Sequence, residues 1–570
     1  MRNPLAEQLH PLVKLLYPNR AEEVCQAIID LIVAYQARHL PTQRWVNQRD
    51  AVLITYGDTL LREGQKPLRT LYYFLTEFLD DTINSVHILP CFPYTSDDGF
   101  SVADYKQINP ELGDWDDIAV LASEYDLMFD GVINHISRWS YWFRRYVAGD
   151  PEYKDFFIEA DPKLDYSAVT RPRALPLLTA IDTSEGPKHL WTTFSDDQID
   201  LNYGNPKVML AILDVLCLYA EQGARFIRLD AIGFLWKEPG TSCMHLPQTH
   251  AAIQLMRVVM DNIAPGTILI TETNVPHRDN ISYFGNGYNE AKMVYQFPLP
   301  PLVMHSFLTR NSEILSRWAG SLAPISRVTT FFNFLASHDG IGMRPVEGLL
   351  NQEQINALVD HCISQNGRVS YRDNGDGTKS PYEMNITYFD ALGLEGESDE
   401  QKAEKLIAAH FILLSLAGVP GIYIHSLLGT QNDIPAVENS GINRRINRSK
   451  LNAQTLKEEL SNPDSIRSQI FKGITQLIQK RKRMSALAPQ ADQKILLMDP
   501  RIFAVERYNS QTGGHVLCLC NLSTDNIEMS VDFVGRDMIS GRRINFHTKL
   551  EPYGCQWIKS PNEIQHRKVW

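Results

Sequence analysis

The sequence predicts an α/β protein: a (β/α)₈ TIM barrel with long inserted loop domains after its third and seventh strands, followed by a C-terminal β domain. Short apolar runs alternate eight times with longer amphipathic segments, which is the pattern of such a barrel. Two of the connections are too long for plain loops. After a last helical segment near Ser465–Arg483, alternating apolar runs such as Val516–Asn521 and Ile527–Phe533 indicate the β domain.

The eight expected barrel strands are Val52–Tyr56, Ser85–Pro90, Asp126–Asn134, Arg225–Ala231, Thr267–Glu272, Met293–Phe297, Phe331–Asp339 and Gly421–Ser426. Apolar residues recur at helical intervals between them, in Leu68–Phe78, Trp115–Glu124, Val208–Gln222, Thr249–Ile263 and Ala403–Ala417. The same spacing in Ala21–His39 predicts that residues 1–50 form a helical N-terminal extension.

These elements divide the chain into a barrel and its additions. The barrel is expected in three parts, which span residues 51–134, 206–339 and 403–485, interrupted by an inserted domain B (135–205) and a second insertion B′ (340–402), with the C-terminal β domain over 486–570. The Pro-rich stretch Thr170–Leu177 in the first insertion cannot form a regular helix. Such long loops are usually functional, and the loops after barrel strands form the active-site mouth.

Composition and charge exclude several classes of function. The net charge of −12 argues against nucleic-acid or anionic-membrane partners. No apolar run approaches the roughly 18–20 residues of a membrane span, and Met1–His10 does not have the pattern of a secretory signal. The eight cysteines are scattered, as expected of thiols in a reducing cytoplasm. Dinucleotide-binding, P-loop and HExxH motifs are absent from the sequence.

One predicted strand carries two opposite charges on the same face. Arg228 and Asp230 are two residues apart in Arg225–Ala231, so their side chains leave the strand on one side. Buried charges are costly unless they pair or take part in chemistry. Considered alone, this motif leaves a structural ion pair as an alternative to a catalytic role.

Similar polar groups follow four other strands. They are Asp97 and Asp98 after the second strand, Asn134-His135 at the third, Glu272 at the fifth and His338-Asp339 at the seventh. Each has a structural alternative: a core histidine for His135, turns for Asp97–Gly99 and Asp339-Gly340, and a solvated strand end for Glu272. Because strand ends of a barrel converge on one mouth, the whole set predicts an active site.

These segments carry a resemblance to a known family. Asp130-xxx-Asn134-His135, Arg228-x-Asp230, Glu272 and His338-Asp339 resemble, in order and context, the four signature segments of the α-amylase superfamily, glycoside hydrolase family 13. The chain resembles the sucrose phosphorylase group of that family in Lys237–Cys243, Arg171-Pro-Arg173 and Arg444–Arg448. The longer glucosylglycerate phosphorylases are more similar still, in the N-terminal extension and in Leu190–Tyr203, Thr271–Asn280 and Ser380–Tyr388.

Two departures from sucrose phosphorylases argue against sucrose as the substrate. This chain has Thr273-Asn274 where those enzymes typically have Val-His, and Tyr382-Glu383 where they have Tyr-Gln. The resemblance implies that both places lie near the leaving group or acceptor.

The resemblance and general chemistry together suggest roles for the site residues. Retaining glycoside transfer needs a nucleophilic carboxylate and an acid/base carboxylate about 5 Å away. Asp230 beside the cation Arg228 is the better nucleophile, and Glu272, without a basic neighbour in its motif, suits the acid/base role. Asp339 would stabilise the transition state. The resemblance implies sugar binding by Asp97, His135, Arg228, His338 and Arg448, with Phe100 and Phe194 as apolar walls and Tyr382 beside the acceptor.

A phosphorylase must accept phosphate rather than water on the glucosyl-enzyme. Arg173 is the candidate for phosphate, since a guanidinium binds phosphate through two hydrogen bonds; a surface arginine is the alternative. Arg444 and Glu383 are candidates for acceptor contacts. A glycerate carboxylate would also need an arginine or lysine, which the sequence does not identify.

The expected function is that of a glycosyltransferase of the phosphorylase type acting on 2-O-α-glucosylglycerate. Double displacement through a glucosyl-Asp230 intermediate would give α-glucose 1-phosphate and glycerate. Phosphorylases of sucrose, sucrose 6′-phosphate or glucosylglycerol are alternatives, as is an α-glucosidase or transglucosidase. A non-catalytic barrel normally loses the carboxylates that this chain keeps. We expect no cofactor and no metal, although Asn134 belongs to a calcium-binding segment of many amylases; phosphate is a co-substrate, and relatives suggest a homodimer.

Overall fold

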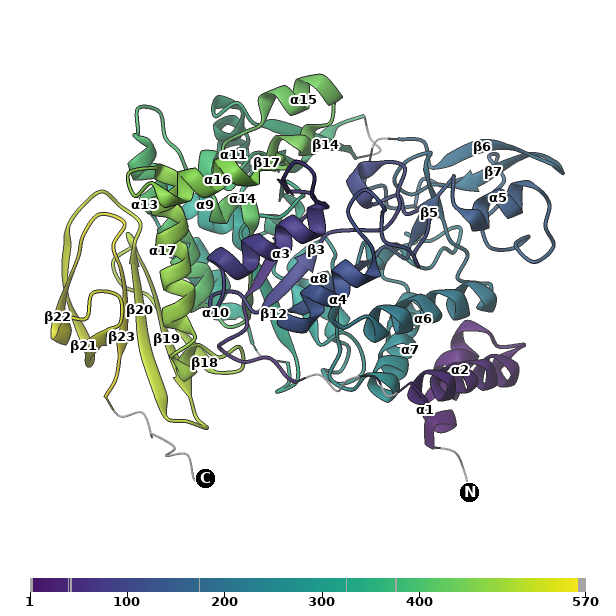
Figure 1. Cartoon of the computed structure of the whole chain (residues 1–570), viewed down its shortest axis with the longest axis horizontal. Coiled ribbons are helices and arrows are strands. Elements are labelled where there is room, and N and C mark those ends of the chain that lie inside the picture. Colours follow the sequence, from purple (N-terminus) through teal and green to yellow (C-terminus); the bar gives the residue numbers. More distant parts are fainter. Residues whose placement is uncertain are drawn as a thin grey trace.

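The computed structural model describes residues 4–38, 40, 44–173, 175–323, 325–374 and 377–561. Eight parallel strands close into a barrel in chain order, which confirms the predicted fold (Figure 1). They are β1 (Val52–Thr55), β3 (Ser85–Ile88), β4 (Asp126–Gly131), β9 (Ala224–Leu229), β10 (Ile268–Thr271), β11 (Met293–Tyr295), β12 (Thr330–Phe334) and β16 (Val419–Tyr423). Each overlaps one of the eight predicted strands.

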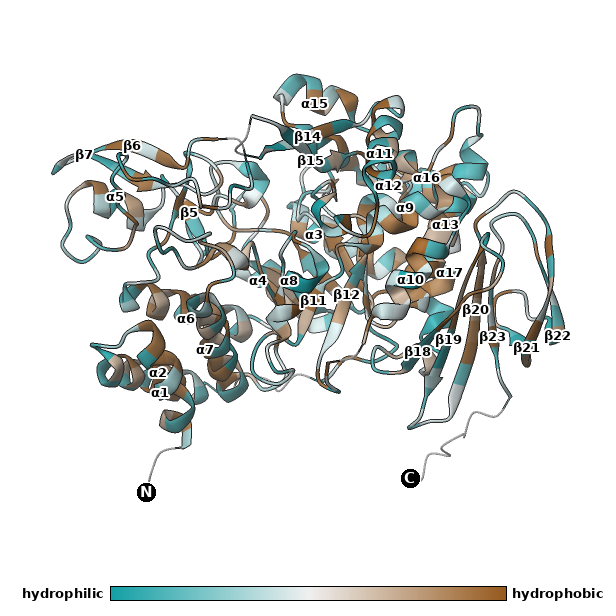
Figure 2. Cartoon of the chain, turned by 180° about the vertical axis from the view of Figure 1, so that it is seen from behind, coloured by the Kyte–Doolittle hydropathy of each residue, from teal (hydrophilic) through white to brown (hydrophobic). Residues whose placement is uncertain are grey.

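The barrel strands are buried on both faces, which explains why they read as unbroken apolar runs. Val52, Leu53 and Ile54 of β1, for example, have no exposed surface. The helices around the barrel include α3 (Pro67–Phe78), α4 (Trp115–Glu124), α6 (Pro206–Glu221), α7 (Pro247–Ile263), α9 (Leu299–Thr309), α10 (Glu313–Ser321), α13 (Asp399–Ser415) and α17 (Ile466–Arg481). Figure 2 shows hydrophobic segments gathered in the barrel strands. No helix in the described part of the chain has the length and apolarity to cross a membrane.

The N-terminal extension is a pair of helices, α1 (Pro4–Leu16) and α2 (Ala21–Gln36), which pack against α6 and α7 (Figure 1). Leu9, Val13, Ile28 and Ile32 are fully buried in this contact. The predicted helix Ala21–His39 ends at Gln36, and His39 lies outside the described residues.

Both insertions extend from the carboxyl ends of barrel strands. The first contains β5 (His135–Ser137), α5 (Tyr141–Val147), β6 (Leu178–Thr183), β7 (Gly186–Trp191) and β8 (Gln198–Asp200). The second contains β13 (Ile341–Gly342), the 3₁₀ turn η4 (Arg344–Val346), α11 (Gln352–Ser364), β14 (Arg368–Asp373), β15 (Lys379–Asn385) and α12 (Tyr388–Ala391). Residues 171–173 form no regular helix, as their proline requires.

The C-terminal domain is a six-stranded antiparallel sheet, as predicted. Its strands, in sheet order, are β18 (Asp492–Leu496), β19 (Ile502–Asn509), β20 (Gly514–Asn521), β23 (Cys555–Lys559), β21 (Ile527–Asp537) and β22 (Arg543–Leu550). Trp557 stacks on Phe411 of α13 with ring centroids 4.8 Å apart, and its indole N–H donates to Ser415 Oγ at 2.8 Å. This buried contact joins the sheet to the barrel.

A buried ion network lies at the amino ends of the barrel strands. Arg225 Nη1 of β9 donates to Asp50 Oδ1 (2.8 Å) and to Asp126 Oδ2 of β4 (2.6 Å), and Arg44 Nη2 also donates to Asp50 Oδ1 (2.7 Å). Asp50 and Arg225 are fully buried. Burial alone would raise the pKa of Asp50, but Arg44 and Arg225 hold it well below its ordinary value. The network ties the segment before β1 to two neighbouring strands.

Replacing Asp50 should therefore destabilise the barrel. We expect Asp50→Ala to lower the free energy of unfolding by about 3–5 kcal/mol, because Arg225 and Arg44 lose their shared carboxylate. Thermal or urea unfolding measures the change. Lys457→Gln is the control, since it breaks an ion pair to Glu77 whose side chains are both about half exposed and contribute little. Equal unfolding midpoints for the two variants would contradict the role of the network.

Candidate active site

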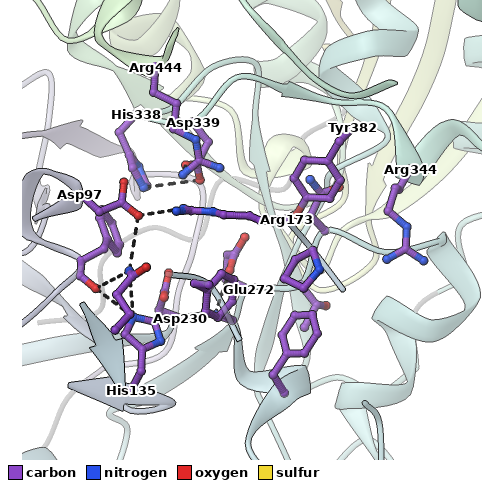
Figure 3. A pocket seen from close by; sticks show the side chains of 18 of the residues that line it. Asp97, His135, Arg173, Asp230, Glu272, His338, Asp339, Arg344, Tyr382 and Arg444 are labelled. Carbon is purple, nitrogen blue, oxygen red and sulfur yellow. Dashed lines mark hydrogen bonds and ion pairs between the residues drawn. The ribbon is translucent and has the colours of Figure 1, made fainter. Parts of the chain in front are cut away.

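A cavity opens at the carboxyl ends of the barrel strands, under the two insertions (Figure 3). Eleven of the fourteen predicted site residues line it: Asp97, Phe100, His135, Arg173, Phe194, Asp230, Glu272, His338, Asp339, Tyr382 and Arg444. The structure thus brings together side chains from five strand ends and from both insertions. The three that do not line it are Arg228, Glu383 and Arg448.

The guanidinium of Arg228 lies beneath the floor of the cavity and holds three carboxylates. Its Nη1 donates to Asp130 Oδ1 (2.5 Å) and Asp230 Oδ1 (2.8 Å), and its Nη2 lies 3.7 Å from Glu272 Oε2. His87 Nε2 lies 2.7 Å from the other oxygen of Asp130. The predicted pair of Arg228 and Asp230 is therefore both structural and part of the site.

The backbone beyond β9 brings Asp230 and Glu272 side by side. Ala231 has a left-handed conformation (φ 46°), which is costly for a residue with a side chain, and its N–H donates to Glu272 Oε2 at 3.0 Å. The Glu272 N–H continues the pairing of β10 with β9 by donating to the Leu229 carbonyl at 3.2 Å. Both carboxylates are therefore fixed at adjacent strand ends.

The acidities of these two groups differ from the simplest expectation. Burial raises the pKa of Glu272 to about 7, helped by the charges of Asp230 and Asp339 and opposed by Arg228. Burial also raises the pKa of Asp230, and Arg228 opposes that shift as well. Arg228 therefore limits the cost of ionising Asp230 but does not lower its pKa below normal. Glu272 does have a basic neighbour, which its motif does not reveal.

Asp339 is the strongly acidic member of the cluster. Arg444 Nη1 lies 2.6 Å from Asp339 Oδ1, and His338 Nε2 lies 3.4 Å from Oδ2. Burial raises the pKa of Asp339, but Arg444, His338 and Arg228 more than offset this, so the pKa falls below its ordinary value. Carboxylates in one site whose pKa values are driven apart are typical of paired acid and base roles.

A strained turn presents Asp97 to the cavity. Asp97 and Asp98 both have positive φ (53° and 47°), and Gly99 (φ 113°) leaves no room for a Cβ, which would lie 2.8 Å from the Pro90 carbonyl oxygen. Asp98 points the other way and accepts from Arg448 Nη1 at 2.9 Å. Arg173 Nη2 donates to Asp97 Oδ2 at 2.8 Å, and Figure 3 shows this pair crossing the cavity.

Flat side chains form one wall of the cavity. Phe100 stacks on His338 with ring centroids 4.6 Å apart and an interplanar angle of 6°. His135 and Phe194 lie 5.1 Å apart. Burial lowers the pKa of His338 to about 3, so this imidazole is neutral at physiological pH. Neutral, flat groups of this kind suit the face of a sugar ring.

Three residues expected to bind ligand lie behind the cavity wall instead. Glu383 Oε1 accepts from the Gly340 N–H (2.7 Å) and from Arg444 Nε (3.1 Å). Its Oε2 accepts from Arg444 Nη2 (2.7 Å). Arg448 donates through Nε to the His338 carbonyl at 2.9 Å and through Nη1 to Asp98. Arg228 in turn holds Asp130 and Asp230, so the printed contacts of all three side chains fix residues at the cavity or directly behind it.

Asn134 has a lysine as its partner. Lys237 Nζ lies 2.7 Å from Asn134 Oδ1 and 2.5 Å from Asp200 Oδ2, and its side chain is almost fully buried. Over the residues that the structure describes, no group of three or more His, Cys, Asp or Glu side chains is arranged to hold a metal ion. The Lys237 ammonium group therefore already pairs with the oxygens of Asn134 and Asp200 that could otherwise bind a metal ion.

Several lining residues were not among the predicted site residues. They are Pro172, Gln198, Ala231, Phe234, Met244, Thr273, Asn274 and Arg344. Gln198 and Thr273-Asn274 lie in segments that carry the family resemblance, so a signal for them was present. For Arg344 the only sequence signal was its position five residues after Asp339, in the loop that follows the seventh strand.

Comparisons with known proteins agree with the fold and the site. Residues 78–339 match the α-amylase catalytic-domain model. The chain is 46% identical over 549 residues to a glucosylglycerate phosphorylase of Allomeiothermus silvanus (95% of this chain, 96% of the relative) and 47% identical over 530 residues to one of Escherichia coli (92% and 94%). The crystal structure of sucrose 6F-phosphate phosphorylase from Thermoanaerobacter thermosaccharolyticum superposes with a TM-score of 0.73 at 25% identity, covering 87% of this chain and 97% of that one.

The barrel, the carboxylates at its mouth and these matches define a carbohydrate-active enzyme fold: the chain belongs to the α-amylase family. Within that family its similarity to the glucosylglycerate phosphorylases extends over 92–95% of the chain.

The position of Glu383 behind Arg444 leads to a stability prediction. We expect Glu383→Gln to lower the free energy of unfolding by about 1.5–3 kcal/mol, because it weakens charge-assisted hydrogen bonds to a buried arginine. The control is Glu347→Gln, which affects a more exposed pair with Arg372 and should change little. Unfolding midpoints of both variants test this, and an unchanged midpoint for Glu383→Gln would show that Arg444 does not depend on Glu383.

Proposed function

We propose that the protein is a retaining phosphorylase that converts 2-O-α-glucosylglycerate and phosphate into α-glucose 1-phosphate and glycerate. The observation that carries this proposal is 46–47% identity to two glucosylglycerate phosphorylases over 92–95% of the chain. The carboxylate cluster supports it, since retaining transfer requires two carboxylates at one site, and Asp230 and Glu272 lie at adjacent strand ends.

In the first half-reaction, Asp230 attacks the anomeric carbon while Glu272 gives its proton to the departing glycerate oxygen. The raised pKa of Glu272, about 7, supports this role, because the group still holds its proton near neutral pH. The products of this step are free glycerate and a glucosyl ester of Asp230. Asp339, kept ionised by Arg444, would stabilise the positive charge that develops on the sugar ring.

In the second half-reaction, a phosphate oxygen attacks the anomeric carbon and Asp230 leaves as the carboxylate. Glu272 takes the phosphate proton, which returns both residues to their starting states. Arg173 is the proposed phosphate ligand, because its guanidinium lines the cavity and a guanidinium can bind phosphate through two hydrogen bonds. It must first release Asp97, which accepts from it at 2.8 Å. Asp97 is then available to hydroxyl groups of the sugar.

No metal ion is needed for these steps. Each charge that develops faces a side chain of the chain itself: Asp339 on the sugar side and arginines on the phosphate side. Lys237 already supplies the positive charge beside Asn134 and Asp200. We therefore include phosphate as a co-substrate and no cofactor.

Product analysis tests the proposal. Incubation with glucosylglycerate, glucosylglycerol, sucrose or sucrose 6′-phosphate, each with and without phosphate, should give α-glucose 1-phosphate from glucosylglycerate only when phosphate is present. Asp230→Ala should lower the turnover by at least about 10⁴-fold, because the nucleophile is lost. Free glucose released equally with and without phosphate would instead identify a hydrolase, and release from another glucoside alone would change the acceptor.

The acidity of Glu272 predicts the pH dependence. At saturating phosphate, kcat/KM for glucosylglycerate should fall about tenfold per pH unit above about pH 7, because Glu272 loses the proton that the leaving oxygen needs. Phosphate is kept at a saturating concentration so that the ionisation of phosphate affects only the second half-reaction, in which it attacks the glucosyl-enzyme.

α-Glucosyl fluoride is the matched control substrate, because fluoride departs without a proton. With this donor the decline above pH 7 should be absent for the glucosylation step. The same decline with both donors would assign the titration to a different group.

A further inference from the structure

Three arginine side chains line the cavity, and two of them are committed to carboxylates. Arg173 pairs with Asp97 at 2.8 Å, and Arg444 pairs with Asp339 at 2.6 Å as well as with Glu383. Arg344 differs: it has neither a hydrogen bond nor an ion pair from its side chain to any residue in the described part of the chain, and its Nε is buried without a partner. Its side chain is partly buried, and the charges of Glu347 and Asp279 act on it without forming an ion pair, so an anionic ligand in contact with it would be stabilising.

The fold holds Arg344 on the side of the cavity away from Asp97, His338 and Arg444 (Figure 3). Strand β13 pairs with β15, and the Met343 N–H donates to the Tyr382 carbonyl at 3.0 Å. These hydrogen bonds fix the backbone immediately before Arg344. The charges of Glu272 and Arg344 both act on the Tyr382 hydroxyl. Figure 3 shows Arg344 beyond Tyr382, apart from the cluster of Asp97, His338 and Arg444.

A second unsatisfied polar group lies nearby. Asn274 lines the cavity, and its Oδ1 is buried without a hydrogen-bond partner. The side chain rests on Gly342, where an added Cβ would lie only 2.8 Å from Asn274 Oδ1. Asn274 therefore lies against the short strand that leads to Arg344. A hydroxyl donor on a ligand would satisfy this oxygen.

We propose that Arg344 binds the carboxylate of the acceptor and selects α-glucosides of small hydroxy acids over those of neutral polyols, with Asn274 accepting from an acceptor hydroxyl. The inference rests on the function proposed above and names a specificity residue for it. In glycerate the carboxylate is attached to the carbon whose oxygen Glu272 protonates, so one small molecule can reach both groups.

The chemistry of the two groups fits this ligand. A carboxylate accepts two parallel hydrogen bonds from a guanidinium, and such pairs are strongest where water is excluded. Burial and the neighbouring cation Arg372 lower the pKa of Arg344, which an anion beside it would reverse. A neutral acceptor such as glycerol leaves this cation uncompensated, and glycerate does not.

The test compares two donors that differ only in this carboxylate. Steady-state phosphorolysis of glucosylglycerate and glucosylglycerol is measured for the wild type, Arg344→Gln and Arg344→Lys. We expect Arg344→Gln to raise KM for glucosylglycerate about 10- to 100-fold, as for the loss of hydrogen bonds to a charged group, and to leave kcat/KM for glucosylglycerol within about twofold. Arg344→Lys should fall between these limits, because it keeps the charge but not the fork of two donors.

Arg372→Gln is the matched control, since Arg372 adjoins Arg344 but pairs with Glu347 at 3.0 Å and does not line the cavity. It should leave the preference between the two donors unchanged. The unfolding midpoint of each variant shows whether the protein is intact. In the reverse direction, Arg344→Gln should lower the use of glycerate, but not of glycerol, as acceptor of glucose from α-glucose 1-phosphate.

The other outcomes overturn the inference in distinct ways. Equal losses with both donors would make Arg344 a structural residue, and an unchanged KM for glucosylglycerate would locate the carboxylate elsewhere. A raised KM for phosphate with both donors, at unchanged donor preference, would make Arg344 a phosphate ligand. A wild-type enzyme that does not use glucosylglycerate at all would overturn the proposed function itself, and the inference with it.

Discussion

The buried guanidinium of Arg228 is the contact on which the site depends. Three nearly buried carboxylates this close together could not all ionise readily without a cation between them. Arg228 supplies that cation. It also donates to Asp130, which His87 contacts on its other oxygen, so Asp130 is stabilised by the same positive charge. That charge limits the rise in the pKa of Asp230 and still leaves the pKa of Glu272 near 7. Asp130 therefore limits how far the charge of Arg228 lowers the pKa values of Asp230 and Glu272.

Strand β9 carries an arginine toward each end, and the two serve different purposes. Near its start, Arg225 joins Asp50 and Asp126 in a buried ion network at the amino ends of the strands, away from the cavity. Toward its end, Arg228 contacts Asp230 and lies near Glu272, the two groups that change during the proposed reaction. The first network tolerates no change of charge without loss of stability. Barrels of this family can combine a rigid base with a reactive mouth because strand ends are separated by the length of the strand.

The sequence predicted the elements whose signal is local and missed those that depend on distant pairing. The barrel strands are continuous apolar runs. Asp230 and Glu272 follow theirs directly and Asp339 lies five residues beyond β12, so both fold and cluster could be predicted. Glu383 was expected at the cavity, but its pairing with Arg444 turns it away. Arg344 was missed because it is positioned by the pairing of β13 with β15, across about 40 residues of the chain. The residues next to Glu272 in the sequence likewise could not reveal that the Arg228 guanidinium lies near its carboxylate.

The distribution of charge in the cavity argues for an enzyme that exchanges one anion for another. Asp97 and Asp339 are each paired with an arginine, Asp230 shares Arg228, and Glu272 is largely protonated below pH 7. Among the arginines that line the cavity, Arg344 then remains without an ion pair to any residue that the structure describes. Water, the co-substrate of a hydrolase, gains nothing from such a group. Glycerate and phosphate are both anions, so the cavity needs a cation for each of them: Arg344 for the acceptor carboxylate and Arg173 for phosphate.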